Sequence, residues 1–179
     1  MRTKQLVLTA LFAALTAIGA FLKIQIPVEG IPAITLQFFF TAMAGLVLGA
    51  RWGAVSQAIY VLLGLAGLPI FSAGGGAGYI FYPSFGFLLG LIPAAYVTGR
   101  LCGGYKRPAR IALACAAGLG VLYLVGLPYM ALIFGVYRGT PLPFWRLIRD
   151  GMLIFLPGDA LKIAACVFLA PQLIKRIPA

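Results

Sequence analysis

The chain has 179 residues, of which 63% are hydrophobic and only 9% are charged, and its mean hydropathy is +1.05. A soluble domain carries roughly 25% charged residues, so this composition excludes a water-soluble domain and indicates an integral membrane protein. The net charge of +11 would suggest nucleic-acid binding in a soluble protein. Here the cations gather at the ends of apolar stretches, so we interpret them as topology signals and expect no nucleic-acid partner.

The apolar stretches are long and do not alternate with polar residues, which favours membrane helices over an outer-membrane barrel. We expect an all-α integral membrane protein, with one membrane domain over residues 1–179 and a six-helix bundle. The N-terminal apolar run is too long for a signal peptide and no polar cleavage region follows it, so it is interpreted as a retained first helix. The predicted helices cover residues 5–22, 36–50, 53–68, 85–101, 111–134 and 152–176.

The first predicted helix carries small side chains spaced four residues apart, in the pairs Ala10/Ala14 and Ala13/Ala17. Small side chains let helices approach closely within a membrane. We therefore expect this stripe either to pack inside the bundle or to dock on another membrane protein, and the residues alone leave both alternatives open.

Residues 23–35 precede the second helix and are predicted to form a loop or a broken segment, because they contain Pro27, Gly30 and Pro32. Gln37 and Thr41 are the polar residues of the second helix and fall on one face. Trp52, beside Arg51, marks the next turn and is a candidate interfacial anchor.

The segment 69–86 is rich in glycine, yet it also carries aromatic rings that a hydrophilic linker would lack. Glycine permits tight turns and close approach of the backbone. We predict that the segment folds back as a lid over a site, with a plain connector as the alternative. Its candidate ligand contacts are Gly75, Tyr79 and Tyr82.

The later helices contain two prolines, Pro93 as a possible kink and Pro128 as a predicted break. Between the fifth and sixth helices, residues 135–150 are amphipathic and are expected to lie in the membrane interface, with Trp145 at headgroup level.

Lysine and arginine counts predict the orientation, because cytoplasmic loops are enriched in both. With a cytoplasmic N-terminus, four cations fall outside: Lys23, Arg138, Arg146 and Arg149. Nine fall inside: Arg2, Lys4, Arg51, Arg100, Lys106, Arg107, Arg110, Lys175 and Arg176. Both termini are therefore predicted to be cytoplasmic, which puts the 69–86 loop and the start of the last helix on the external side.

The last predicted helix holds Asp159 and Lys162, three residues apart and thus on one face within pairing reach. Lys162 precedes the basic end at Lys175 by thirteen residues, or roughly 20 Å of helix, so it lies inside a hydrocarbon layer about 30 Å thick. A charge at that depth costs at least ~2.5 kcal/mol and usually faces a partner or a polar cavity.

Three interpretations of this pair remain open: a structural ion pair, a proton relay, or a site for a polar solute. In the third, the aspartate accepts N–H groups and the lysine donates to a carbonyl or carboxylate. Gln37 could add an amide donor and acceptor.

Enzyme chemistry is not expected. The chain has no histidine and three acidic residues, which excludes a histidine-containing triad, paired carboxylates and a zinc site. It also lacks the P-loop pattern, and Cys102, Cys115 and Cys166 have neither disulfide nor metal spacing. We expect no catalytic residue, no metal and no cofactor.

Four stretches resemble the BioY family, the biotin-specific substrate-binding subunits of energy-coupling-factor (ECF) transporters. LPGDALK (156–162) is similar to that family's LPGD-x-x-K motif, and GLAGLPIFSAGGGAGYIF (64–81) resembles its GLPVFAGG-type loop. AITLQ (33–37) is similar to its PITLQ, with Ala33 for proline, and ALFAALTAIGA (10–20) to its alanine-rich first helix. YPSFG (82–86) departs from the family's usual G-P-T-G-G-like turn.

The resemblance implies a six-helix subunit in the bacterial cytoplasmic membrane that captures biotin from outside. It implies a partner module of one transmembrane coupling protein and two ATPase subunits, docked on the alanine face of the first helix. Asp159 and Lys162 match the family's polar pair, so Asp159 is expected to accept the ureido N–H groups. Lys162 would donate to the ureido oxygen or to the valerate carboxylate. The alternatives are another vitamin or small polar solute, or a membrane scaffold whose Asp159–Lys162 pair only fixes helix register.

Overall fold

The computed structural model describes residues 3–25, 32–104 and 107–176, and most of these residues are helical. Arg2, Glu29, Lys106 and the predicted loop breakers Pro27 and Gly30 lie outside the described residues. The long helices are α1 (Thr3–Phe21), α2 (Gln37–Leu65), α3 (Phe85–Cys102), α4 (Pro108–Leu132) and α6 (Leu156–Arg176). The short elements are strands β1 (Lys23–Ile24) and β2 (Ile34–Thr35), the 3-10 helix η1 (Ala77–Phe81), α5 (Phe144–Ile148), and the π turns η2 (Ile133–Tyr137) and η3 (Arg149–Leu153).

Five helical segments of the described residues are long and apolar enough to cross a membrane. The predicted helices 5–22, 85–101, 111–134 and 152–176 correspond to α1, α3, α4 and α6. The predicted helices 36–50 and 53–68 fall within one element, α2, so the count of six helices is not confirmed. The predicted break at Pro128 is wrong, because α4 continues through this proline to Leu132.

The α2 element is folded back on itself at Gly49, which has φ 80° and ψ 175°. The Gln37 amide nitrogen donates to the Tyr60 hydroxyl at 2.8 Å, although the two residues are 23 positions apart. Along a straight helix that separation would be roughly 35 Å. Thr41 likewise reaches Gln57 at 2.9 Å. Residues 37–48 and 50–65 therefore form two antiparallel arms, here called the α2 hairpin.

A layer of buried polar side chains joins the α2 hairpin to α1. The Gln57 amide oxygen accepts from the Thr41 hydroxyl, and its amide nitrogen donates to Thr16 at 3.2 Å and to Ser56 at 3.0 Å. All four residues are fully buried. Each is hydrogen-bonded, so none carries the penalty of an unsatisfied buried polar group. The layer links three helical segments, and the sequence analysis had singled out only Thr41.

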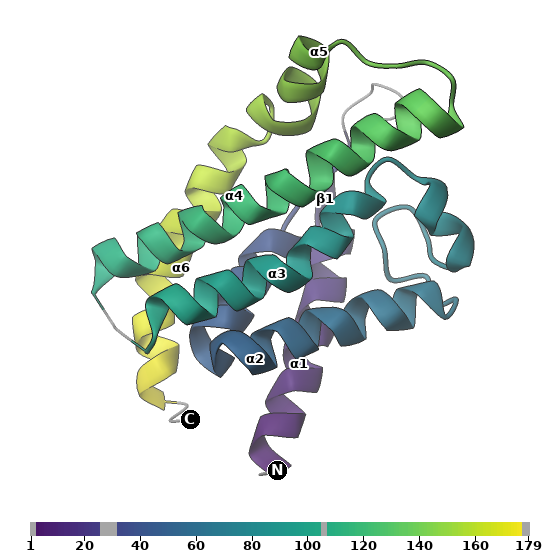
Figure 1. The fold of residues 1–179 in the computed structure, drawn as a ribbon. Helices are drawn as coiled ribbons and strands as arrows, with labels where there is room; N and C mark the ends of the chain where they lie inside the picture. The colour runs from purple at the N-terminus through teal and green to yellow at the C-terminus, as the bar shows by residue number, and fades with distance from the viewer. Residues whose placement is uncertain (1–2, 26–31, 105–106, 177–179) are drawn as a thin grey trace.

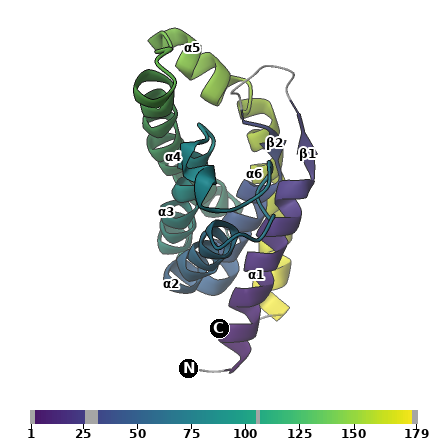
Figure 2. The same cartoon turned by 90° about the vertical axis from the view of Figure 1, so that its right-hand side faces the viewer.

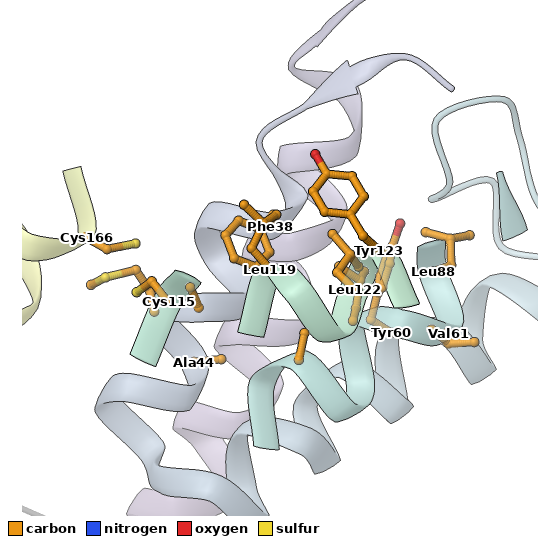
Figure 3. Close-up of a cluster of buried hydrophobic side chains, with 14 of the residues drawn as sticks. Phe38, Ala44, Tyr60, Val61, Leu88, Cys115, Leu119, Leu122, Tyr123 and Cys166 are labelled. Atoms are coloured by element: carbon orange, nitrogen blue, oxygen red, sulfur yellow. The ribbon is translucent and has the colours of Figure 1, made fainter. Parts of the chain in front are cut away.

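Buried hydrophobic side chains from the long helices form one cluster (Figure 3). Phe38 of α2, Leu88 of α3 and Leu122 of α4 contribute to the same cluster. The start of α1 and the end of α6 lie at one end of the bundle, and α5 lies at the opposite end (Figures 1 and 2). We call the end with α5 the cavity end, because the cavity described below is lined by the start of α6, which lies toward that end.

The conformation of Gly49 gives a test of the hairpin. We expect Gly49→Ala to lower the stability by about 1–3 kcal/mol, because this backbone region is essentially restricted to glycine. A Cβ at Gly49 would meet no atom within 4 Å, so a steric clash would not explain the loss.

The matched control is Gly120→Ala in α4. A Cβ there also meets nothing within 4 Å, but the backbone is helical, so alanine should stabilise by roughly 0.5–1 kcal/mol. Thermal unfolding in detergent measures both variants. Equal midpoints for the two would contradict the strained turn at Gly49.

Candidate functional site

A cavity of about 80 Å³ lies among the start of α6, the middle of α4, the first half of α3, the start of α2 and the glycine-rich segment. Its polar lining comprises Thr35, Gln37, Ser72, Tyr79, Ser84, Tyr123, Asp159 and Lys162. Its remaining lining residues are Pro32, Ala33, Phe38, Phe87, Leu88, Leu91, Leu122 and Phe155. Apolar walls with a few convergent polar groups are typical of small-molecule sites.

The position of Asp159 follows from how α6 begins. The helix starts at Leu156, which puts Pro157 in its first turn, where a missing N–H costs nothing and the fixed φ suits a helix. Pro157 is thus a first-turn proline and not a kink. Asp159 also lies in the first turn, where the helix dipole favours a negative charge. One turn later, Lys162 faces the same cavity.

Asp159 and Lys162 form a buried ion pair that also includes Tyr123 of α4. The Lys162 ammonium lies 2.7 Å from Asp159 Oδ1, and the Tyr123 hydroxyl donates to Asp159 Oδ2 at 2.5 Å. Asp159 is only 4% exposed and Lys162 only 8%. Figure 3 shows the hydroxyl groups of Tyr123 and Tyr60 pointing toward the same end of the view, away from Ala44 and Cys115. We call Asp159, Lys162 and Tyr123 the polar triad.

The polar triad keeps hydrogen-bonding capacity toward the cavity. A carboxylate has about four lone-pair sites and an ammonium has three donors. Two acceptor sites of Asp159 are used within the triad, as is one N–H of Lys162. The remaining acceptors and donors stand side by side, which suits a ligand that offers N–H groups next to a carbonyl oxygen.

Gln37 lines the cavity as predicted, but its amide is also held by the protein. Its oxygen accepts from the Thr35 hydroxyl at 2.9 Å, and its nitrogen donates to Tyr60. Tyr60 in turn donates to the carbonyl of Ile70 at 3.0 Å. This chain of hydrogen bonds ties the start of α2 to the glycine-rich segment and fixes the orientation of the amide.

The glycine-rich segment forms one wall of the cavity through Ser72, Tyr79 and Ser84. Its role as a lid stays a prediction. The Tyr79 hydroxyl lies 3.2 Å from the Ser72 hydroxyl, and its ring lies 4.7 Å from that of Phe71. The Lys23 ammonium donates to the Ser72 carbonyl and so ties β1 to the same wall.

Tyr82 and Gly75 were predicted ligand contacts, but neither lines the cavity. The half-exposed Tyr82 ring stacks on Tyr79 with centroids 4.8 Å apart, which places it behind the wall. A Cβ at Gly75 would lie 2.0 Å from the Leu68 carbonyl oxygen. Glycine is therefore required there to pack the loop against the end of α2.

The two alanine pairs of α1 face different directions. Ala10 and Ala14 are exposed, whereas Ala13 is buried and Ala17 is half-buried. The α1 helix packs mainly against α2. One pair is therefore placed for packing inside the bundle, and the other pair remains accessible from outside.

The sequence analysis missed Tyr123, the third member of the polar triad. Its signal in the sequence is weak, because a tyrosine within an apolar helix is compatible with an interfacial anchor and with a core residue alike. Ser72 and Ser84 were missed for a similar reason: a loop serine carries no pattern that distinguishes a cavity wall from a solvent-facing turn.

Known proteins resemble this chain over almost its whole length. The family model described as "BioY family" matches residues 1–179. A probable biotin transporter BioY of Lysinibacillus sphaericus is 37% identical over 97% of this chain and 88% of its own length. The biotin transporter BioY of Thermotoga maritima is 35% identical over 96% of both chains.

A solved structure shows the same fold. It is described as the crystal structure of the S-component for biotin from an ECF-type ABC transporter. It matches with a TM-score of 0.72 and 28% identity, covering 97% of this chain and 92% of that one. With matches of this extent to the family model and to relatives above 30% identity, the chain belongs to the BioY family.

Proposed function

We propose that this protein captures biotin and takes it up across the cytoplasmic membrane, as the substrate-binding subunit of an ECF transporter. The observation that carries the proposal is the buried polar triad facing a cavity with apolar walls. Support comes from relatives named as biotin transporters and from a structural neighbour named as the S-component for biotin.

The chemistry of biotin suits the cavity. Its ureido ring offers N–H donors beside one carbonyl oxygen, and the rest of its bicyclic system is apolar. Asp159 accepts from a ureido N–H, and Lys162 donates to the ureido oxygen, because the two charged groups already lie side by side. The Tyr123 hydroxyl donates to the other carboxylate oxygen, Oδ2, and so holds the Asp159 side chain in place. The apolar side chains of Leu88, Leu122 and their neighbours pack against the rings.

In the membrane arrangement that we propose for this role, the chain crosses the membrane six times. The two arms of the α2 hairpin count as separate crossings. An even number of membrane passes places both chain ends on one side of the membrane. This agrees with the position of the start of α1 and the end of α6 at the same end of the bundle (Figure 1). The excess of arginine and lysine at that end supports a cytoplasmic position for it. The cavity end then faces the exterior.

Energy for uptake comes from partner subunits and not from this chain, which needs no cofactor. The exposed pair Ala10/Ala14 offers a close-approach surface for a transmembrane coupling protein, and two ATPase subunits complete the module. Ala13 and Ala17 serve packing within the bundle.

The ion pair provides the first test. Asp159→Asn and Lys162→Met should each weaken biotin binding at least about thirtyfold, because truncating one partner of a buried charge pair costs roughly 2–5 kcal/mol. Biotin-dependent thermal stabilisation of the detergent-purified protein measures this. The paired Asp159→Asn/Lys162→Met variant should fold and still fail to respond to biotin. If biotin does not stabilise the wild-type protein against thermal unfolding, the biotin proposal is wrong and the ion pair has only a scaffold role.

Tyr123 provides a second test as a positioning residue. Tyr123→Phe should weaken biotin binding about tenfold, because a hydrogen bond to a charged group contributes roughly 1.5–3 kcal/mol. The control is Tyr129→Phe on the same helix, which loses a hydroxyl bonded to the Ile80 carbonyl away from the cavity. Calorimetric titration with biotin compares the two. Equal affinities would show that Tyr123 does not act through Asp159.

The alanine face provides a third test. Ala14→Leu should leave the biotin-dependent thermal shift intact but reduce uptake about tenfold, because an added bulky side chain at a close helix contact costs roughly 1–3 kcal/mol. Ala116→Leu, at an exposed position of α4, is the matched control and should transport normally. Co-purification with the coupling protein is the direct measurement. Unchanged assembly of the Ala14→Leu variant would assign docking to another face.

A further inference from the structure

The segment that connects α4 to α6 has an unusual charge balance for this chain. Between residues 133 and 153 it carries Arg138, Arg146 and Arg149 against a single acidic residue, Asp150. It contains η2, α5 and η3, and α5 lies at the cavity end of the bundle (Figure 1). We call residues 133–153 the connecting segment. The function proposed above makes no use of its charges.

Helix length places the connecting segment outside the hydrocarbon layer. The run Phe144–Arg176, in which α5, η3 and a two-residue turn precede α6, has 33 residues, or at most about 50 Å at the α-helical rise. The α6 helix alone has 21 residues and covers about 31 Å, which matches the ~30 Å of hydrocarbon. The turns before Leu156 therefore extend into the headgroup region.

Asp150 holds two guanidinium groups in place. Its Oδ1 accepts from Arg149 Nε at 2.6 Å, and its Oδ2 lies 3.4 Å from Arg146 Nε. The Asp150 side chain is 5% exposed, whereas both arginine side chains are 54% exposed. The buried carboxylate binds each arginine through Nε, and no hydrogen bond of the described residues involves their terminal Nη atoms. One carboxylate cannot neutralise two guanidinium groups, so this cluster keeps a net positive charge.

Exposed aromatic side chains surround the cationic cluster. Phe144 is 77% exposed and Trp145 is 66% exposed, whereas Leu147 of the same helix is buried. Tyr137 is also exposed. Aromatic rings beside arginine on a short interfacial helix are typical of a surface that lies in the headgroup layer.

We propose that Arg146, Asp150 and Arg149 form a binding site for the headgroup of an anionic phospholipid. The lipid phosphate would accept from the Nη groups that Asp150 leaves available, in the fork geometry that arginine uses for phosphate. Trp145 and Phe144 would lie against the glycerol and upper acyl region of the same lipid. The buried carboxylate fixes the spacing of the two guanidinium groups, so the site is built before the lipid arrives.

Trp145 permits a local test, because the chain has two tryptophans and Trp52→Phe leaves Trp145 as the only one. This variant is placed in nanodiscs with equal mole fractions of phosphatidylglycerol and phosphatidylcholine. In one preparation the phosphatidylglycerol carries brominated acyl chains, and in the other the phosphatidylcholine does. Bromine quenches tryptophan fluorescence only at short range.

The proposal predicts stronger quenching by brominated phosphatidylglycerol, corresponding to roughly fivefold local enrichment. That factor converts the ~1 kcal/mol expected for one arginine near anionic lipid. The enrichment should decline at high salt, since charge attraction is screened. Equal quenching by the two lipids would overturn the headgroup site. Absence of quenching by both would place the segment outside the membrane, against a protein or water, and would overturn the proposal as well.

Matched variants assign the effect to the cluster. Arg146→Gln/Arg149→Gln/Asp150→Asn removes all three charges, keeps hydrogen-bonding side chains and lowers the net charge by one. It should abolish the enrichment at Trp145. Arg51→Gln lowers the net charge by the same amount at the bend of α2 and should leave the enrichment unchanged. Loss of enrichment in both variants would indicate a general charge effect and would reject the site. If the triple variant does not fold, the comparison of the two brominated lipids with the Trp52→Phe protein still tests the proposal.

Discussion

One buried contact, between the Asp159 carboxylate and the Lys162 ammonium, is the constraint around which the site is built. Removing either charge from water costs several kcal/mol, and a buried pair is often no more stabilising than apolar residues of the same size. A second donor from Tyr123 offsets part of the cost. Stability alone is thus a poor reason to keep this pair in an apolar bundle. The hydrogen-bonding capacity that it retains toward the cavity provides a better one, since a bound polar group would complete it.

The surrounding helices hold that contact by polar links as much as by apolar packing. The α2 hairpin turns at Gly49 and is locked to α1 by the buried amide of Gln57. Its open end is tied through Gln37 and Tyr60 to the glycine-rich segment. Inside lipid, apolar contact gives little preference for one helix arrangement over another, because lipid tails are equally apolar. Hydrogen bonds of fixed geometry supply the missing specificity.

The cavity and the connecting segment are coupled by the chain itself. The α6 helix carries Asp159 in its first turn, immediately after the π turn that contains Asp150. In the arrangement proposed above, the arginines and aromatic rings of the connecting segment lie in the headgroup layer and so set the depth of the site below it. Asp159 and Lys162 would then lie inside the hydrocarbon layer, in the first two turns of α6.

The sequence by itself determined the membrane class, most helix positions and the pairing of Asp159 with Lys162 on one helix face. The length of an apolar stretch and the position of a charged residue within it are properties of a short piece of sequence, and both have large energetic consequences in a membrane. They can therefore be recognised without knowing which residues lie nearby in space. The family resemblance also rested on contiguous motifs. Tertiary structure alone decided that Tyr123 completes the triad, that Tyr82 and Gly75 lie behind the wall, and that residues 36–65 fold into a hairpin around Gln57. Those outcomes depend on contacts between residues distant in the chain, such as Tyr123 with Asp159 across 36 positions, and a helical periodicity does not encode which neighbour each face will meet.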